Sequence, residues 1–231
     1  MDLMTKVLAV IPARGSSKGI QRKNIVDFDG KPLMAWTILA SLASKKVSRT
    51  IVSSDDQEIL SIAGRFGAHA LQRPDCLSGD LASSESVVLH ALKCEKEHGR
   101  DYDVIVLLQP TSPLRTSADI DSALDAFYLS KANSLVSICE IDNKFLKSFF
   151  RDEQGRLTST VSSRFSSKPR QSLPKTFAPN GAIYVIEEPV FCQIKSFYSD
   201  YCIGFEMPQD KSIDIDTPED LFLAIQGVTG K

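Results

Sequence analysis

Four cations lie close together in the stretch VLAVIPARGSSKGIQRKN, which covers residues 7–24. They are Arg14, Lys18, Arg22 and Lys23, and glycines and serines separate them. Glycine allows a ligand to approach the backbone, serine hydroxyls donate hydrogen bonds, and cations neutralise phosphate charge. The stretch has neither the G-x-x-x-x-G-K-[ST] pattern nor G-x-G-x-x-G. On these residues alone, a phosphate site and a solvated basic loop are both open.

A pair of carboxylates near the C-terminus could hold a metal ion. In SIDIDTPEDL, Asp214 and Asp216 alternate with isoleucines, and alternate residues of an extended chain face the same side. Thr217, Pro218 and Asp220 then form a helix-start pattern that would pin the pair. Two carboxylates on one side suit Mg²⁺, or Mn²⁺ in its place, together with substrate phosphates. The alternative is a surface helix start, which explains Asp220 better than Asp214.

A third polar group follows an apolar run in LLQPTSPLRT, residues 107–116. Two prolines stiffen this stretch, and Gln109 could read the edge of a nucleotide base. Arg115 could reach a carboxylate or a phosphate. The competing interpretation is a rigid turn before a capped helix.

The elements around these motifs predict an α/β fold. Short apolar runs predict buried strands at residues 7–12, 49–54, 69–72, 103–109 and 134–141. Helical patterns alternate with them at residues 32–46, 55–67, 83–98 and 117–130. This alternation predicts a Rossmann-like, mostly parallel sheet with helices on both faces. Ligands bind beyond the carboxyl ends of strands in such sheets, where all three motifs lie.

The alternation stops near residue 142. Residues 142–180 are polar and rich in serine, proline and basic residues, and we expect them to lack a core of their own. A long irregular stretch in a compact domain is usually a functional loop, an arm or disorder. We therefore expect a nucleotide-binding domain of residues 1–141 and 181–231, with residues 142–180 as an extension.

Composition narrows the classes of function. The chain has 231 residues, 42% of them hydrophobic, and a formal net charge of −2, which disfavours a general nucleic-acid binder. No run approaches the roughly 20 apolar residues that span a bilayer, and the start does not have the pattern of a signal peptide. Five widely spaced cysteines form no C-x-x-C pair. We expect a cytoplasmic protein with no nucleic-acid or membrane partner.

Together the motifs resemble the bacterial CMP-sialic acid synthetases, the acylneuraminate cytidylyltransferases, whose close cousins activate legionaminic and pseudaminic acids. The blocks that carry the resemblance are IPARGSSKGIQRKN, RPDCLSGDLASSES, LLQPTSPLRT, KPRQSLPKTFAPNGAIYV and QDKSIDIDTPEDL. The resemblance implies a homodimer in which residues 142–180 serve dimerisation and the sugar site. With Mg²⁺ it implies the reaction of CTP with a nine-carbon 2-keto acid sugar to give a CMP-sugar and pyrophosphate.

The resemblance also implies roles for single residues. It implies catalytic roles for Arg14, Lys23 and Asp216, and metal binding by Asp214 and Asp216. The residues that it implies for the nucleotide are Arg14, Ser17, Lys18, Lys23, Asn24, Arg73 and Ser84. Those that it implies for the sugar are Gln109, Lys147, Arg170, Asn180 and Tyr184. No general base follows from it.

Other functions are open at this point. The related enzyme for the eight-carbon acid Kdo shares the IPAR opening but usually has a Gly-Lys-Pro pattern at Arg22, Lys23 and Asn24, and lacks PNGAIY. Lys144 and Phe145 replace a His-Pro pair frequent in the sialic acid enzymes, which leaves the exact sugar undetermined. A glycosyltransferase would commonly carry its Asp-x-Asp in mid-chain. An inactive nucleotide or sugar sensor would not need both aspartates and the loop cations.

Overall fold

Seven strands form the central sheet, in the order β11-β7-β10-β6-β1-β4-β5, in a computed structural model that describes residues 5–79 and 82–229. The strands are β1 (Val7–Pro12), β4 (Arg49–Ser54), β5 (His69–Gln72), β6 (Val104–Leu107), β7 (Ser134–Ile141), β10 (Thr176–Glu187) and β11 (Cys202–Glu206). In this sheet β10 runs antiparallel to its neighbours β6 and β7, and the other paired strands are parallel. Asp80 and Leu81, part of the second resemblance block, lie outside the described residues.

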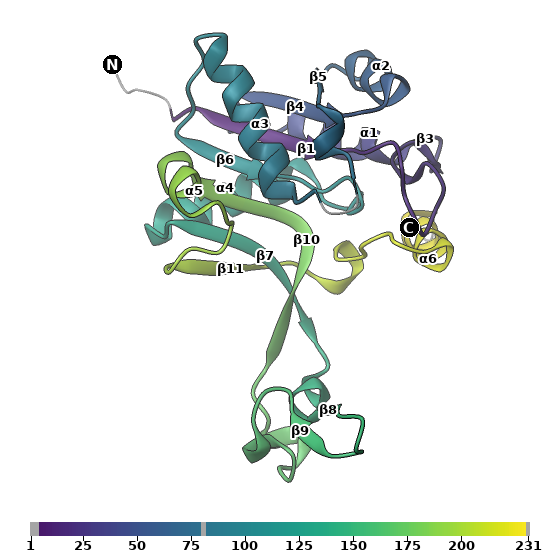
Figure 1. Cartoon of the computed structure of the whole chain (residues 1–231), viewed down its shortest axis with the longest axis vertical. Coiled ribbons are helices and arrows are strands. Elements are labelled where there is room, and N and C mark those ends of the chain that lie inside the picture. Colours follow the sequence, from purple (N-terminus) through teal and green to yellow (C-terminus); the bar gives the residue numbers. More distant parts are fainter. Residues whose placement is uncertain (1–4, 80–81, 230–231) are drawn as a thin grey trace.

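Helices cover both faces of the sheet (Figure 1). Buried residues of α1 (Leu33–Leu42), α2 (Gln57–Arg65) and α4 (Ser117–Ser130) belong to one core cluster. Those of α3 (Ser84–Glu97) and α5 (Glu188–Ile194) belong to the other. The predicted Rossmann-like, mostly parallel sheet with helices on both faces is therefore confirmed. No helix in the described ranges has the length and hydropathy needed to cross a membrane.

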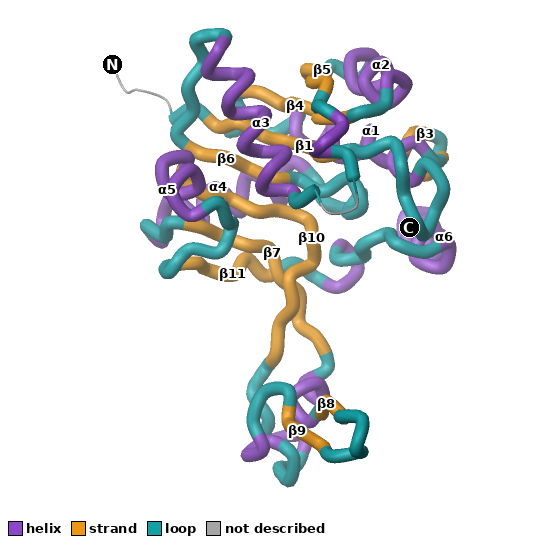
Figure 2. Tube along the Cα trace, viewed as in Figure 1, coloured by secondary structure: helices purple, strands orange, loops and turns teal. Residues whose placement is uncertain are grey.

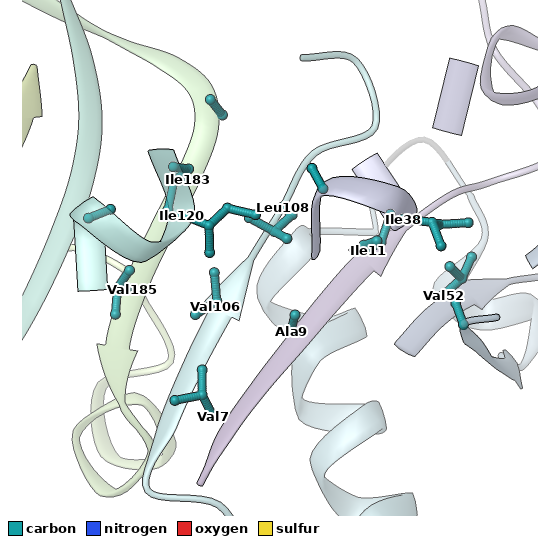
Figure 3. Close-up of a cluster of buried hydrophobic side chains, with 14 of the residues drawn as sticks. Val7, Ala9, Ile11, Ile38, Val52, Val106, Leu108, Ile120, Ile183 and Val185 are labelled. Carbon is teal, nitrogen blue, oxygen red and sulfur yellow. The ribbon is translucent and has the colours of Figure 1, made fainter. Parts of the chain in front are cut away.

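The first strand shows why its sequence forms a central strand. Val7, Ala9 and Ile11 pack into the first cluster, which Figure 3 shows, whereas Leu8 and Val10 pack into the second. All five are at most 1% exposed. Successive side chains of a strand point to opposite faces, so a continuous apolar run fits a sheet that is covered on both sides.

The first helix ends earlier than its sequence pattern predicts. The helical pattern runs to Lys46, but α1 ends at Leu42. Ser44 is the reason, because its Oγ accepts hydrogen bonds from the backbone N–H groups of Lys46 and Val47 and donates one to Asp121. Such local bonds compete with helical ones.

Residues between β7 and β10 form an arm that projects from the domain (Figures 1 and 2). The outer halves of these strands pair from Thr176 with Ile141 to Pro179 with Ile138, and they carry β8 (Phe149–Arg151) and β9 (Leu157–Ser159) at the far end. Because β10 is continuous, it crosses the predicted domain boundary between residues 180 and 181. The arm also has a small core, contrary to our expectation, formed by Leu146, Phe165 and Leu173.

A hairpin and the last helix lie at the end of the sheet where the sequence motifs are found. The hairpin of β2 (Asp27–Phe28) and β3 (Lys31–Pro32) leads into α1. The last helix, α6 (Pro218–Thr229), packs against this hairpin through a cluster that includes Phe28, Leu33, Ile215 and Ala224. The N-terminal and C-terminal motifs are thereby brought side by side.

Candidate active site

A cavity of about 600 Å³ opens beyond the carboxyl ends of β1, β5 and β6. From β1 the chain builds β4 and β5 on one side, then crosses to β6 on the other, so this is where the strand order reverses. Open α/β sheets bind their ligands at such a point. The predicted site residues that line the cavity are Arg14, Ser17, Lys18, Lys23, Asn24, Arg73, Ser84, Gln109, Asp214 and Asp216.

The loop after β1 is held down from within the protein. Asn24 is only 5% exposed, and its Nδ2 donates to the carbonyl oxygen of Arg14 at 2.8 Å, which closes the loop. The backbone N–H of Gly15 donates to Asp55 Oδ1 at 3.1 Å. A side chain on Gly15 would lie 2.9 Å from Asp56 Cβ, so glycine is needed for this approach. Contacts within the protein thus position the loop.

The structure separates one loop cation from the other three. Arg22 pairs with Asp56 at 2.9 Å and with Glu58 at 3.0 Å, at the start of α2. Arg14, Lys18 and Lys23 line the cavity, whereas Arg22 does not. The positive charge that a ligand meets therefore comes from three of the four cations that the sequence brings together.

Arg73 and Asp55 form a polar pair beneath this loop. Arg73 is 4% exposed, and its Nη2 lies 3.2 Å from Asp55 Oδ1, the same oxygen that accepts from Gly15. Burial lowers the pKa of Arg73, and the hydrogen bond that Arg73 donates to Asp55 opposes that shift. Sequence reasoning missed Asp55, although it directly follows the buried strand β4, the position where ligand-site residues are expected.

The two aspartates near the C-terminus face the cavity together, as their alternation predicts. Ile213 and Ile215 point into the core cluster beside α6. The predicted helix start is present, since Asp220 accepts from the Thr217 N–H at 2.8 Å and donates its own N–H to Thr217 Oγ1 at 3.2 Å. These bonds hold the segment that carries Asp214 and Asp216.

The Asp214 carboxylate is less readily ionised than an ordinary aspartate. Although the side chain keeps exposed surface at the open cavity, the protein around the carboxylate raises its pKa. A hydrogen bond from Thr111 opposes this shift, and the nearby charge of Asp216 adds to it. An opposite charge placed nearby would favour the ionised form of this carboxylate.

The loop and the aspartates contact each other directly. Lys23 Nζ lies 2.6 Å from Asp216 Oδ1, and the Lys23 side chain is only 14% exposed. Gly19 packs against the backbone carbonyl of Asp216, where any side chain would collide. The cationic loop and the carboxylates are therefore two walls of one site.

The donor set fits a metal that shares its ligands with a substrate. In the described ranges, no group of three or more His, Cys, Asp or Glu side chains could enclose a metal ion. Mg²⁺ typically takes one or two carboxylates and completes its shell with water and substrate phosphates. Asp214 and Asp216 fit that requirement, and the cations Arg14, Lys18 and Lys23 line the same cavity.

Some residues of the motif LLQPTSPLRT line the cavity, and others are buried in the protein. Gln109 and Thr111 line the cavity. Arg115 does not, because it is 2% exposed and its Nη1 donates to the carbonyl oxygen of Ala182 at 2.7 Å. Burial lowers the pKa of Arg115 to about 9. Arg115 thus anchors the turn to β10 and does not reach the cavity.

Four residues predicted to bind the sugar do not line this cavity. Lys147 and Arg170 lie on the arm, and Arg170 pairs with Asp142 at 3.4 Å beside a second cavity of about 470 Å³. Asn180 is buried in hydrogen bonds within the protein. The ring of Tyr184 packs 5.7 Å from that of Phe197, and burial raises the pKa of Tyr184 to about 12. Their roles toward a sugar stay predictions.

The fold and the cavity define a Rossmann-like α/β protein with a cationic and carboxylate-lined site at the reversal of strand order. The family model described as Cytidylyltransferase matches residues 8–172. The chain therefore belongs to the cytidylyltransferase family and is a nucleotidyltransferase by family.

Named relatives narrow the comparison further. The N-acylneuraminate cytidylyltransferase of Escherichia coli O18:K1:H7 is 35% identical over 96% of this chain, which spans 52% of that protein. The pseudaminic acid cytidylyltransferase of Campylobacter jejuni is 32% identical over 95% of this chain and 94% of its own length. The CMP-N,N'-diacetyllegionaminic acid synthase of Legionella pneumophila is 34% identical over 93% of both chains.

A solved structure supports the fold. The structure of CMP:2-keto-3-deoxy-manno-octonic acid synthetase complexed with CTP superimposes with a TM-score of 0.74 over 98% of this chain and 99% of that one. The two sequences are 17% identical, so the likeness concerns the fold alone.

Proposed function

We propose that this protein joins the cytidylyl group of CTP to a nine-carbon 2-keto acid sugar and releases pyrophosphate. The proposal rests on the contact between Lys23 and Asp216, which both line one cavity. This contact brings the loop that we assign to phosphate together with the carboxylates that we assign to the metal. The names of the relatives support the substrate class, since they specify N-acylneuraminate, pseudaminic acid and legionaminic acid.

The triphosphate lies along the loop after β1 in this proposal. Arg14, Lys18 and Lys23 supply the positive charge, and Ser17 supplies a hydroxyl donor. The N-terminus of α3, which begins at Ser84, also opens on the cavity and favours negative charge there. As the α-phosphorus bonds to the anomeric oxygen of the sugar, its bond to pyrophosphate breaks and the hydroxyl proton passes to solvent. Neutralising the pyrophosphate is the main task of these cations.

Asp214 and Asp216 hold the metal in this proposal. Bound Mg²⁺ or Mn²⁺ supplies charge neutralisation at the phosphate that reacts and at the leaving group. The chain's own part is to orient two carboxylates from one pinned segment. Thr111 fixes that segment as well, since its carbonyl oxygen accepts from the Ile215 N–H at 2.8 Å.

The base and the sugar occupy the remaining wall. Gln109 offers an amide that can hydrogen-bond to the edge of a pyrimidine or to a sugar hydroxyl. It follows the end of β6 and lines the same cavity as the loop and Asp214. Arg73, which is buried under the loop and paired with Asp55, also lines the cavity and places a cation near an acidic substrate.

Two copies of the chain form the working enzyme in this proposal, and it acts in the cytoplasm. The arm exposes large apolar side chains, of which Phe150 at 69% and Leu157 at 62% are the most exposed. Exposed apolar clusters of this kind mark contact surfaces. Lys147 and Arg170 lie on the same arm, outside the cavity of their own chain, so pairing of two chains gives them a route to a sugar site.

Pyrophosphate release tests the function. The purified protein is incubated with CTP, Mg²⁺ and one of four sugars: N-acetylneuraminic, legionaminic or pseudaminic acid, or the eight-carbon acid Kdo. We expect release with at least one nine-carbon sugar, little with Kdo, and little when ATP or GTP replaces CTP. Equal turnover with ATP would refute the cytidine assignment. Release only with Kdo would refute the nine-carbon assignment, and CMP transfer to none would favour an inactive sensor.

A further inference from the structure

The strand that leads into the arm carries a bulge beside the active site. The register between β10 and β7 shifts between Pro179 and Tyr184, and Asn180 and Gly181 lie in that interval. Gly181 has φ +75°, a backbone conformation that favours glycine. A side chain on Gly181 would also lie 2.5 Å from Gln109 Oε1 and 3.6 Å from Asp214 Oδ2. The bulge therefore lies close to the Gln109 amide and to the Asp214 carboxylate and leaves no room for a side chain at Gly181.

Asn180 makes hydrogen bonds in three directions and is 4% exposed. Its Oδ1 accepts from Ser137 Oγ of β7 at 2.6 Å and from the Ala182 N–H at 3.2 Å. Its Nδ2 donates to Ser212 Oγ at 2.9 Å. The backbone oxygen of Asn180 accepts from Ser112 Oγ at 3.3 Å. The side chain is thus used within the protein and does not point into the cavity lining.

Two of these partners lie next to residues of the metal site. Ser212 precedes Asp214 by two residues, and Ser212 Oγ donates onward to the carbonyl oxygen of Pro208 at 2.9 Å. Ser112 follows Thr111, which hydrogen-bonds to Asp214. We infer that Asn180 is a positioning residue, which holds the Asp214 segment through Ser212 and sets the geometry of the metal site.

This inference rests on the proposed metal role of Asp214 and adds a residue that acts through another. Groups that orient metal ligands typically change metal affinity or activity by 10-fold to 100-fold when they are removed. Ser212→Ala removes the hydroxyl that receives Asn180 Nδ2 and leaves the other bonds of Asn180 in place. Ser137→Ala is the matched control, because it removes a different partner of Asn180, on β7.

The test is a titration with Mn²⁺ followed by electron paramagnetic resonance, in the presence of CTP and without sugar. We expect Ser212→Ala and Asn180→Ala each to weaken Mn²⁺ binding by roughly tenfold. The double variant should bind no more weakly than Asn180→Ala, since the two residues act through one contact. Ser212→Thr keeps a hydroxyl and should restore most of the affinity. Ser137→Ala should lower the melting temperature without changing Mn²⁺ binding.

The possible failures are distinguishable. If the parental protein binds Mn²⁺ with CTP but Ser212→Ala binds it equally well, the inference is wrong and the proposed function stands. An equal loss of affinity in Ser137→Ala would also overturn the inference, because Asn180 would then matter only for packing. Absence of Mn²⁺ binding by the folded parental protein would refute the proposed metal site, and the inference with it.

Discussion

Lys23 Nζ lies 2.6 Å from Asp216 Oδ1, although 193 positions separate the two residues in the chain. The ammonium group of Lys23 therefore lies at the carboxylate oxygen where we expect the metal ion to bind. Lys23 and a metal ion cannot both sit at that oxygen. A bound triphosphate gives Lys23 another anionic partner and so frees Asp216 for the metal ion. The metal ion and CTP should therefore bind cooperatively.

Replacing Lys23 tests this competition. Lys23→Met keeps the apolar stem and removes the charge, so Mn²⁺ should bind Asp216 more tightly than in the parental protein when CTP is absent. The gain in Mn²⁺ affinity that CTP brings should shrink. Turnover should fall by the equivalent of roughly 1.5–3 kcal/mol, the contribution of a charge-assisted contact. Calorimetric titration with and without CTP measures the coupling.

Arg22 provides the control for Lys23. It belongs to the same loop but pairs with Asp56 and Glu58 outside the cavity lining. Arg22→Met should keep turnover close to the parental value, because exposed ion pairs contribute little. If Arg22→Met impairs turnover as strongly as Lys23→Met, then loop charge in general and not the Lys23 contact determines activity.

Asp216→Asn should abolish most activity and leave the fold intact. The substitution keeps the shape of a side chain that is 70% exposed and removes its charge. We expect at least a hundredfold loss of turnover, which corresponds to roughly 2.7 kcal/mol in the barrier, and a near-parental melting temperature. EDTA should stop the parental enzyme, and Mg²⁺ or Mn²⁺ should restore it. Full turnover in EDTA would contradict the metal assignment.

The raised pKa of Asp214 predicts that this residue costs stability at neutral pH. Partial burial raises the pKa, so the folded protein holds the proton more tightly than the unfolded chain. The stability from this proton is present below the unfolded pKa of about 3.9 and is lost as pH rises through the folded value. Asp214→Asn should therefore raise the melting temperature at pH 7 while it lowers activity. The difference should shrink at pH 4.

Asp220 should respond in the opposite direction and serves as the comparison. Hydrogen bonds from Thr217 lower its pKa, so the stability that it supplies is present above the unfolded pKa and is lost as pH falls through the folded one. Asp220→Asn should lower the melting temperature at pH 7. Equal shifts for Asp214→Asn and Asp220→Asn would show that burial of Asp214 has no energetic effect.

A buried carboxylate outside the site should control acid stability. Glu95 is 2% exposed and accepts from Arg100 Nε at 2.7 Å and from Tyr102 Oη at 2.6 Å. Burial alone would raise the pKa of Glu95, but the bonds from Arg100 and Tyr102 lower it below its ordinary value. The stability from this group is present above the unfolded pKa and is lost as pH falls through the lowered one.

Glu95→Gln tests that contribution in a thermal or denaturant melt at pH 7. Breaking a buried ion pair typically costs about 3–5 kcal/mol, so a clear loss of stability is expected. Glu97→Gln is the control, because Glu97 is exposed and lies 4.0 Å from Lys93. Its effect should stay below about 0.5 kcal/mol. Similar effects of the two substitutions would mean that the Glu95 cluster is not stabilising.

The arm should be the dimer contact. Phe150→Asp places a charge on its most exposed aromatic residue and should shift the protein from dimer to monomer in sedimentation experiments at micromolar concentration. Phe222→Asp, on α6, changes a residue of similar exposure, 60%, outside the arm and should leave the dimer intact. A parental protein that sediments only as a monomer would contradict the arm's proposed role.

Much of the scaffold could be predicted because its signals are local. The continuous apolar run from Val7 to Pro12 suits a buried strand, and the Thr217 to Asp220 pattern forms the helix start that its spacing predicts. The alternation of Asp214 with isoleucines correctly places both aspartates on one side. These features depend on side chains within a few residues of each other, so the sequence by itself determined them.

Only the tertiary structure decided which polar groups meet. It paired Lys23 with Asp216 and turned Arg22 toward α2. It buried Arg115 against a backbone carbonyl and Asn180 among serine hydroxyls. Two cations of one loop, Arg22 and Lys23, thus have different partners, one outside the cavity and one inside it. The physical reason is that a polar side chain's partner comes from a distant strand end or turn, and strand order and loop path set that distance. Local periodicity carries no record of those contacts.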